Sequence, residues 1–328
     1  MEIIGPNPFT VFAGPNASGK SNIFEALQLL NHIFLYGLKI FSAFGSKGEL
    51  LTFQTSKYQL SYEITFEDGI KIPYTFYFSS DESETDSPIA GSIVANPLSL
   101  SDFANVEKRN VFIHDWIARD KKYENDFEQF IDNFSRIFVG NSKIQRVPSV
   151  DKLSGDAENL KEIIPRIFEK KDRLEDFNDW LRILVPEFES IEIKKSNIDG
   201  SNDFFIHEKS SGKPFSRKLI SDGTYNILSL MAAVYQSGKP QFLCIEEPEN
   251  GLNPYVIKTL VEFFRKQCGE KGHYIWLNTH SQTLVKHLQP KELILVDKIN
   301  GETKIKQFPG NYDLHGLELD EAWLSNAL

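Results

Sequence analysis

The chain has 328 residues, of which 41% are hydrophobic and 25% are charged, as in an ordinary soluble globular protein. This length allows two domains, or one domain with a large insertion. The formal net charge of −10 argues against a protein that coats nucleic acid broadly, because Lys and Arg supply the affinity for phosphate backbones.

The cysteines and the N-terminus indicate a cytoplasmic protein. Cys244 and Cys268 belong to no CxxC or Cys/His cluster, which argues against a zinc site and against a disulfide framework. No run of about 18 apolar residues predicts a membrane span. The first residues also lack the basic region of a signal peptide. We therefore expect a reducing cytosol and no membrane partner.

The first elements are predicted to be a strand, a loop and a helix. Residues 9–13 have the apolar composition of a short buried strand, and residues 14–21 form a Gly-containing loop. In residues 21–34 apolar side chains recur at a spacing of three to four, which predicts a helix.

A change of pattern follows this helix. Within residues 50–78, apolar and polar residues alternate on both sides of Asp68-Gly69, which predicts an antiparallel hairpin or meander with one buried face. The acidic, Ser-rich residues 79–92 are predicted to form a solvated loop or edge.

Residues 101–187 are predicted to be mostly helical. Residues 159–184 have an apolar stripe around Pro165. An earlier stretch places five apolar side chains on one helical stripe: Phe127, Phe130, Ile131, Phe134 and Ile137. Such stripes form either the core of a helical lobe or a surface that binds a partner.

The C-terminal part returns to strands and then alternates. Strands are expected around Ile191 and Ile206, and a hairpin is expected at Asn300-Gly301. Between them the pattern predicts helix 224–236, strand 241–245, helix 254–268, strand 273–278, helix 281–287 and strand 292–296. Alternation of this kind implies a mainly parallel sheet with crossover helices.

The strongest motif is GPNASGKS at residues 14–21, which matches G-x-x-x-x-G-K-[ST] between a predicted strand and a predicted helix. Glycines let the backbone N–H groups approach phosphates closely, and the helix N-terminus favours anions. In such a loop, Lys20 reaches the outer phosphates and Ser21 ligates Mg²⁺.

Two further motifs follow apolar strands. QFLCIEEPEN at 241–250 ends a strand with two adjacent carboxylates, which are costly to bury unless a cation or a reaction uses them. Glu246 is then the carboxylate on the metal side, and Glu247 orients or deprotonates the attacking water. NTHS at 278–281 places His280 where it can contact a phosphate or that water.

A fourth motif, LISDGTYNILSL at 219–230, places Ser221, Asp222 and Gly223 at the start of a predicted helix. An ordinary helix N-cap has the same composition. Its position about 20 residues before the carboxylate strand favours a functional role.

In this order, the motifs resemble those of ABC-type ATPases, in the branch shared with chromosome-maintenance, repair and OLD-family (overcoming lysogenization defect) proteins. GPNASGKSN resembles the Walker A motif, SDGT the signature, IEEPENGLNP the Walker B motif and D-loop, and THS the switch histidine. The resemblance covers residues 9–35 and 215–296 closely. DAENLKEIIPRIF, LVPEFESI and DLHGLELDEAWLSNAL are similar to small bacterial stand-alone ATPases of the OLD-like type.

The resemblance implies an α/β fold: an ABC-ATPase head with a mostly parallel P-loop sheet, flanking helices and an antiparallel β subdomain, interrupted by an inserted helical lobe. The expected parts are 1–98 for the N-terminal part of the head, 99–187 for the lobe and 188–328 for the rest of the head. The implied cofactors are ATP and Mg²⁺, with Ser21 and Glu246 on the metal and Glu247 and His280 in catalysis. The implied nucleotide-binding residues are Gly14, Asn16, Ala17, Ser18, Gly19, Lys20, Ser21, Asn22, Ser221 and Gly223.

In this family two heads hold two nucleotides between them, so the resemblance implies a homodimer or higher oligomer in which Ser221 and Gly223 act on the partner's nucleotide. Two departures bear on the expected fold. Only eight residues precede Phe9, so the usual first strand is missing or replaced. No clear glutamine loop follows the Walker A helix, and Gln54 is a weak candidate for it.

OLD nucleases carry a Toprim nuclease domain after the ATPase, whereas the residues after His280 predict only a strand, a hairpin and a tail. The sequence therefore favours an ATPase that regulates a separate effector, such as a Toprim-type nuclease, in anti-phage defence or DNA maintenance. The alternatives are a nucleotide-binding subunit of a transporter and an ATP-dependent clamp or scaffold with negligible turnover. Direct DNA binding stays open.

Overall fold

The computed structural model describes residues 2–36, 57–65, 71–79, 93–95, 131–141, 152–195, 202–325 and 327–328. The chain divides into two compact units, one formed by Met1–Glu25 with Asp132–Leu328 and the other by Ala26–Ile131. These divisions differ from the sequence-based boundaries at 98/99 and 187/188. Gln54 lies outside the described residues, and so does the part of the expected lobe that precedes residue 131.

A six-stranded sheet forms the centre of the first unit, in the order β12-β11-β1-β10-β9-β5. Every neighbouring pair is parallel except the hairpin of β11 and β12. The predicted mainly parallel sheet is therefore confirmed. Its strands are β1 (Phe9–Ala13), β5 (Phe134–Ile137), β9 (Phe242–Glu246), β10 (Tyr274–Thr279), β11 (Leu293–Ile299) and β12 (Glu302–Gln307).

The edge strand β5 corrects one prediction. Phe134 and Ile137 were expected on a helical stripe, but they belong to a strand that pairs in parallel with β9. The backbone is helical only up to residue 133, and Phe127 and Phe130 lie outside the described residues. A short apolar run fits either period, and here pairing with a strand more than 100 residues away decides between them.

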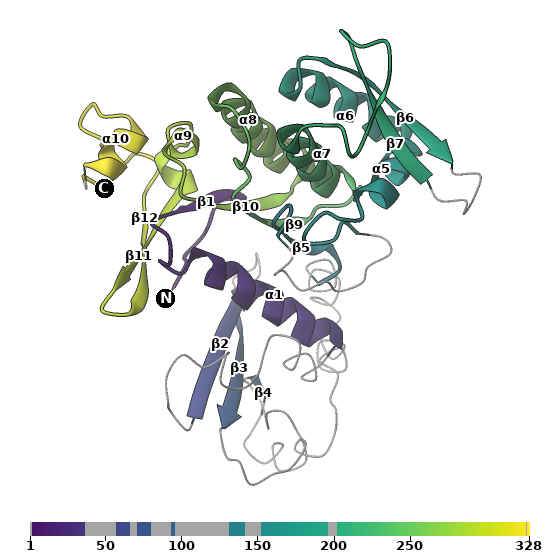
Figure 1. Cartoon of the computed structure of the whole chain (residues 1–328). Helices are drawn as coiled ribbons and strands as arrows, with labels where there is room; N and C mark the ends of the chain where they lie inside the picture. Colours follow the sequence, from purple (N-terminus) through teal and green to yellow (C-terminus); the bar gives the residue numbers. More distant parts are fainter. Residues whose placement is uncertain are drawn as a thin grey trace. The chain divides into compact units, whose positions relative to one another are not determined.

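The first unit also contains helices, which Figure 1 labels. They are α5 (Leu160–Phe168), α6 (Lys171–Leu184), α7 (Asp222–Tyr235), α8 (Pro254–Lys271), α9 (Gln282–Val285) and α10 (Leu319–Leu324), with a 3-10 turn at Pro290–Glu292. Asn253 caps α8 through a bond from Val256 N, and Gly272 ends it in the left-handed conformation. The last predicted helix, 281–287, is shorter in the structure, because α9 contains only four residues.

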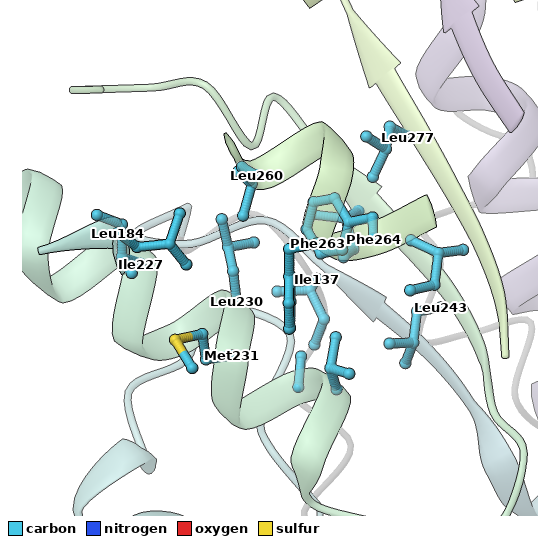
Figure 2. Packing of buried hydrophobic residues seen from close by; sticks show 14 of the residues in the cluster. Ile137, Leu184, Ile227, Leu230, Met231, Leu243, Leu260, Phe263, Phe264 and Leu277 are labelled. Carbon is cyan, nitrogen blue, oxygen red and sulfur yellow. The ribbon is translucent and has the colours of Figure 1, made fainter. Parts of the chain in front are cut away.

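One face of the sheet packs against helices α7 and α8 in a hydrophobic core (Figure 2), which we call the aliphatic core because the strands contribute mainly aliphatic side chains to it. Side chains alternate along each strand, so β9 presents Leu243 and Ile245 to this core. The helices contribute buried residues that include Leu230, Met231, Leu260, Phe263 and Phe264. The same cluster of buried residues continues into α5 and α6 through side chains such as Ile163 and Phe177.

The opposite face of the same strands is aromatic. Phe12 of β1 contacts Phe24, in the first turns of α1 (Lys20–Tyr36), with ring centroids 5.5 Å apart, and contacts Trp276 of β10 at 5.3 Å. Phe242 of β9 lies 4.8 Å from Trp276 and 5.5 Å from Phe134. A row of rings therefore crosses four strands, from Phe134 on β5 to Phe12 on β1, and ends at Phe24 of α1.

Two smaller antiparallel sheets complete the described residues. In the first unit, β6 (Phe188–Lys195), β7 (Asn202–Glu208) and β8 (Phe215–Ser216) form one of them. In the second unit, β2 (Lys57–Thr65), β3 (Lys71–Ser79) and β4 (Ile93–Ala95) form the other, which confirms the predicted meander. None of the described helices is long and apolar enough to cross a membrane.

Candidate functional site

The loop at residues 14–21 joins β1 to α1, as predicted, and its glycines are required by close packing. A Cβ on Gly14 would lie 2.0 Å from Val296 O, and one on Gly19, whose φ is +102°, would lie 2.2 Å from Thr303 Oγ1. Thr303 also donates a hydrogen bond to Ser18 O at 3.1 Å. Ser18 Oγ is buried and has no partner among the described residues. The loop therefore keeps a narrow cradle with an unused polar atom.

Lys20 folds back over this loop. Its ammonium donates to Gly14 O and to Pro15 O, each at 2.8 Å. Burial lowers the pKa of Lys20, and the nearby carboxylates Glu247, Glu249 and Glu246 oppose that shift. The site thus holds a largely buried cation next to the loop that follows β1.

Ser21 and Glu246 meet although they lie 225 positions apart, because the carboxyl ends of β1 and β9 face the same edge of the sheet. Ser21 Oγ donates to Glu246 Oε2 at 2.7 Å. Asn278, which is the register partner of Glu246 on β10, donates to the same oxygen at 3.0 Å. The proposed metal ligands Ser21 and Glu246 are therefore adjacent. The sequence analysis assigned no role to Asn278, which contacts the same carboxylate oxygen.

Arg136 is the main residue that sequence reasoning missed. It lies on β5, donates to Glu246 Oε1, and reaches Glu25 Oε1 of α1 at 3.2 Å. Arg136 is only 8% exposed and Glu246 3%, so the ion pair is buried, and it compensates a charge that would be costly alone. An arginine inside the apolar run FSRIF was the available signal, but the helical reading of that run hid it.

Glu247 and His280 also come together. Glu247 has a φ of +45°, uncommon for a residue other than glycine, and its N–H donates to Asn278 O at 3.0 Å. Its Oε2 accepts from Asn250 Nδ2 at 3.1 Å, and its Oε1 lies 3.4 Å from His280 Nδ1. Both side chains are partly exposed, so this carboxylate–imidazole pair faces solvent at the edge of the site.

Ser221 and Gly223 lie at the N-terminus of α7, with contacts to a different loop. Ser221 Oγ accepts from Thr224 N at 3.1 Å, so it is a helix N-cap. A Cβ on Gly223 would lie 2.7 Å from Gly251 O, and Asn226 Nδ2 donates to Pro248 O and Asn250 O. The start of α7 therefore packs on the segment that follows Glu247. Asn16, Ala17 and Asn22, the remaining predicted nucleotide-binding residues, are exposed on the 14–22 segment.

The donor set fits Mg²⁺ held together with phosphate. Among the described residues, no group of three or more His, Cys, Asp or Glu side chains could bind a metal without other ligands. Ser21 and Glu246 offer one hydroxyl and one carboxylate next to the loop. Mg²⁺ is commonly bound by one or two protein oxygens, with waters and substrate phosphates completing its octahedron.

Comparison with known proteins identifies a family and similar folds. A family model described as "AAA domain, putative AbiEii toxin, Type IV TA system" matches residues 9–286. An SMC head bound to the C-terminal winged-helix domain of ScpA is similar in structure, with a TM-score of 0.55 at 16% identity over 96% of this chain and 92% of that one.

A second similar structure is an SMC head with an extended coiled coil, bound to the C-terminal domain of ScpA derived from Pyrococcus furiosus. Its TM-score is 0.51 at 15% identity, over 97% of this chain and 92% of that one. Among curated proteins, none matches the sequence. The fold is that of SMC and ABC ATPase heads, a mostly parallel sheet accompanied by antiparallel sheets.

Proposed function

The chain belongs to the AAA-domain family whose model matches residues 9–286, and on this basis we propose that it binds ATP with Mg²⁺ and hydrolyses it. The observation that carries the proposal is the convergence of the 14–21 loop, Glu246, Glu247 and His280 at the carboxyl edge of β1, β9 and β10. In open parallel sheets, this edge is where ligands bind.

Backbone N–H groups of the 14–19 segment and the N-terminus of α1 would hold the phosphates. Gly14 and Gly19 admit no side chain, because Val296 and Thr303 lie where a Cβ would be, and this packing fixes the path of the loop. Lys20 would exchange the carbonyls of Gly14 and Pro15 for phosphate oxygens, a stronger interaction for an ammonium. Asn16, Ala17, Ser18 and Asn22 belong to the same segment and are proposed to contact the nucleotide.

Ser21 and Glu246 would hold the Mg²⁺, which when bound neutralises charge on the phosphates. Arg136 keeps Oε1 of Glu246 occupied, so Oε2 is the oxygen that faces Ser21. The protein therefore presents one carboxylate oxygen and one hydroxyl to the metal in a fixed arrangement.

Glu247 is proposed to orient and deprotonate the attacking water, and His280 to stabilise the same water or the terminal phosphate. Their separation of 3.4 Å lets the imidazole orient the carboxylate. The link from Asn278 to the backbone of Glu247 joins this pair to the metal-side carboxylate, since the same asparagine also contacts Glu246.

A second copy of the chain is proposed to complete the site with Ser221 and Gly223. Ser221 lies at an exposed helix N-terminus, and α7 extends for 14 residues, so a partial positive charge faces outward there. Within one chain Gly223 packs against Gly251, whereas Ser221 stays exposed, which leaves that N-terminus open to a partner's nucleotide.

The dimerisation cycle is proposed to regulate a separate effector in the cytoplasm, such as a Toprim-type nuclease in anti-phage defence or DNA maintenance. The similar SMC heads are described as bound to domains of ScpA, which supports a head that works through a partner protein. Phage resistance should be lost when neighbouring genes are deleted and the ATPase is retained. Full resistance from the ATPase gene alone would contradict an effector.

The catalytic part is tested by ATP turnover against protein concentration, with wild type beside Glu247→Gln. Specific turnover should rise with concentration, and the variant should lose roughly 100-fold or more of it while ATP traps a stable dimer. Lys20→Ala serves as the control that loses ATP binding itself. Specific turnover that does not depend on concentration would contradict the composite site. An ATP-stabilised dimer without turnover in the wild type would instead identify a clamp.

A further inference from the structure

A third carboxylate, Glu249, follows Glu247 by two residues on the same loop and contacts the segment that carries His280. It is 8% exposed, and its Oε1 accepts a hydrogen bond from the hydroxyl of Thr279, which is fully buried. Thr279 Oγ1 in turn accepts from the backbone N–H of Ser281 at 2.9 Å. The two residues that flank His280 are therefore both connected to Glu249.

The second oxygen of Glu249 is costly for the fold. Oε2 is buried and has no hydrogen-bond partner among the described residues. A buried acceptor left without a donor destabilises the folded state, because it has lost its hydrogen bonds to water. Burial also raises the pKa of Glu249, with His280 lowering it and Glu247 raising it. A carboxylate at this position does not serve the stability of the fold, so we look for a role of Glu249 in the geometry of the site.

The segment that carries Glu249 is also held by hydrogen bonds from α7. Asn226 of α7 donates to Pro248 O at 3.0 Å and to Asn250 O at 2.8 Å, so both neighbours of Glu249 are fixed. The backbone of Glu247 is fixed by Asn278. Glu249 is therefore a rigid acceptor against which the 279–281 segment can be positioned.

The pair of Glu247 and His280 needs such support, because its side chains are 29% and 48% exposed. Exposed ion pairs contribute little and do not fix a geometry alone. We propose that Glu249 is a positioning residue that, through the hydroxyl of Thr279, fixes the backbone on both sides of His280 so that the imidazole faces Glu247. The catalytic consequence rests on the proposed ATPase function, whereas the geometric one does not.

The geometric consequence is tested without nucleotide, by two-dimensional NMR of the histidine imidazoles. The chain has 7 histidines, and His280→Ala identifies the resonance of His280. Thr279→Val and Glu249→Ala should each shift that resonance, and Thr279→Ser, which keeps the hydroxyl, should leave it near the wild-type position. An unchanged resonance in Thr279→Val would overturn the proposal. Thermal unfolding of each variant verifies that it is folded. If Glu249→Ala does not fold, Thr279→Val alone decides the test.

The catalytic consequence is tested by ATP turnover in two backgrounds. When His280 is present, Thr279→Val and Glu249→Ala should each lower kcat by roughly tenfold to hundredfold with KM unchanged. The double variant should lower kcat no further than either single variant, because both changes break the same connection. Glu249→Gln, whose amide oxygen still accepts from Thr279, should recover most of the rate. In the His280→Ala background neither change should cost more, whereas an equal loss there would show a purely structural role. Absent turnover in the wild type would refute the proposed ATPase, and the NMR result would still decide the positioning.

Discussion

The two faces of the central sheet differ in chemistry, although the same strands build both. Toward α7 and α8, the strands present aliphatic residues such as Leu243, Ile245 and Leu277, all fully buried. On the other face the strands carry the aromatic row that includes Phe12 and Trp276, and among these rings lies the Arg136–Glu246 ion pair. One face is a packing layer, whereas the other carries the charged pair whose carboxylate contacts Ser21.

The short strand β9 shows how one segment serves both layers. Alternation sends Leu243 and Ile245 into the aliphatic core, and sends Cys244 and Glu246 to the aromatic face. Glu246 is consequently aligned by rigid strands on both sides, from Arg136 of β5 and Asn278 of β10. Stability and site geometry should therefore respond to different substitutions, and this separation can be tested.

The largest loss of stability is expected on the aliphatic face. Phe263→Ala should lower the free energy of unfolding by about 4 kcal/mol, because it removes a fully buried ring and leaves a cavity. The affinity for ATP and Mg²⁺ should stay unchanged where the variant is folded. Denaturant unfolding and a nucleotide-binding titration measure the two quantities, and Phe263→Leu is the matched control. A weakened Mg²⁺ affinity would show that the two faces are not separable.

A smaller loss of stability, with a response to Mg²⁺, is expected on the other face. Arg136→Met keeps an apolar side chain but removes the guanidinium that pairs with the buried Glu246. The free energy of unfolding should therefore fall by about 3 kcal/mol. Because Mg²⁺ can supply the missing positive charge, it should raise the thermal midpoint of this variant more than that of the wild type.

The matched control for Arg136→Met is Glu25→Gln, which removes the half-exposed partner of the same guanidinium. It should cost less than about 1 kcal/mol, because an exposed carboxylate is well solvated without its partner. If Arg136→Met were as stable as the wild type and showed no added response to Mg²⁺, the ion pair would have no part in presenting Glu246.

Much of the fold follows from local pattern. The strand–loop–helix at residues 9–34, the alternation after residue 221 and the hairpin at Asn300-Gly301 were all predictable, since each depends on residues close in sequence. At that hairpin, Asn300 and Gly301 have φ values of 53° and 84°, the left-handed conformation that their residue types favour. The family roles of Lys20, Ser21, Glu246, Glu247 and His280 were assigned from motifs, and they stay proposals for the experiments above.

The misread segment is 134–137, where a short apolar run was interpreted as a helical stripe. Its strand conformation depends on pairing with β9. The hydrophobic pattern of only four residues does not reveal a pairing partner so distant in sequence. The roles of Arg136, Thr303 and Glu249 were hidden for the same reason. Each acts through contacts that only chain folding brings about: Arg136 with Glu246, Thr303 with Ser18, and Glu249 with Thr279.

The sequence by itself determined which chemical groups the site contains, because motif spacing and strand ends are local properties of the chain. Only the tertiary structure decided which of those groups touch: that Arg136 occupies one oxygen of Glu246, and that Glu249 connects to the flanks of His280. The physical reason is that parallel pairing joins strands distant in sequence and sets them side by side in register. Side chains that lie far apart along the chain then meet at one edge of the sheet.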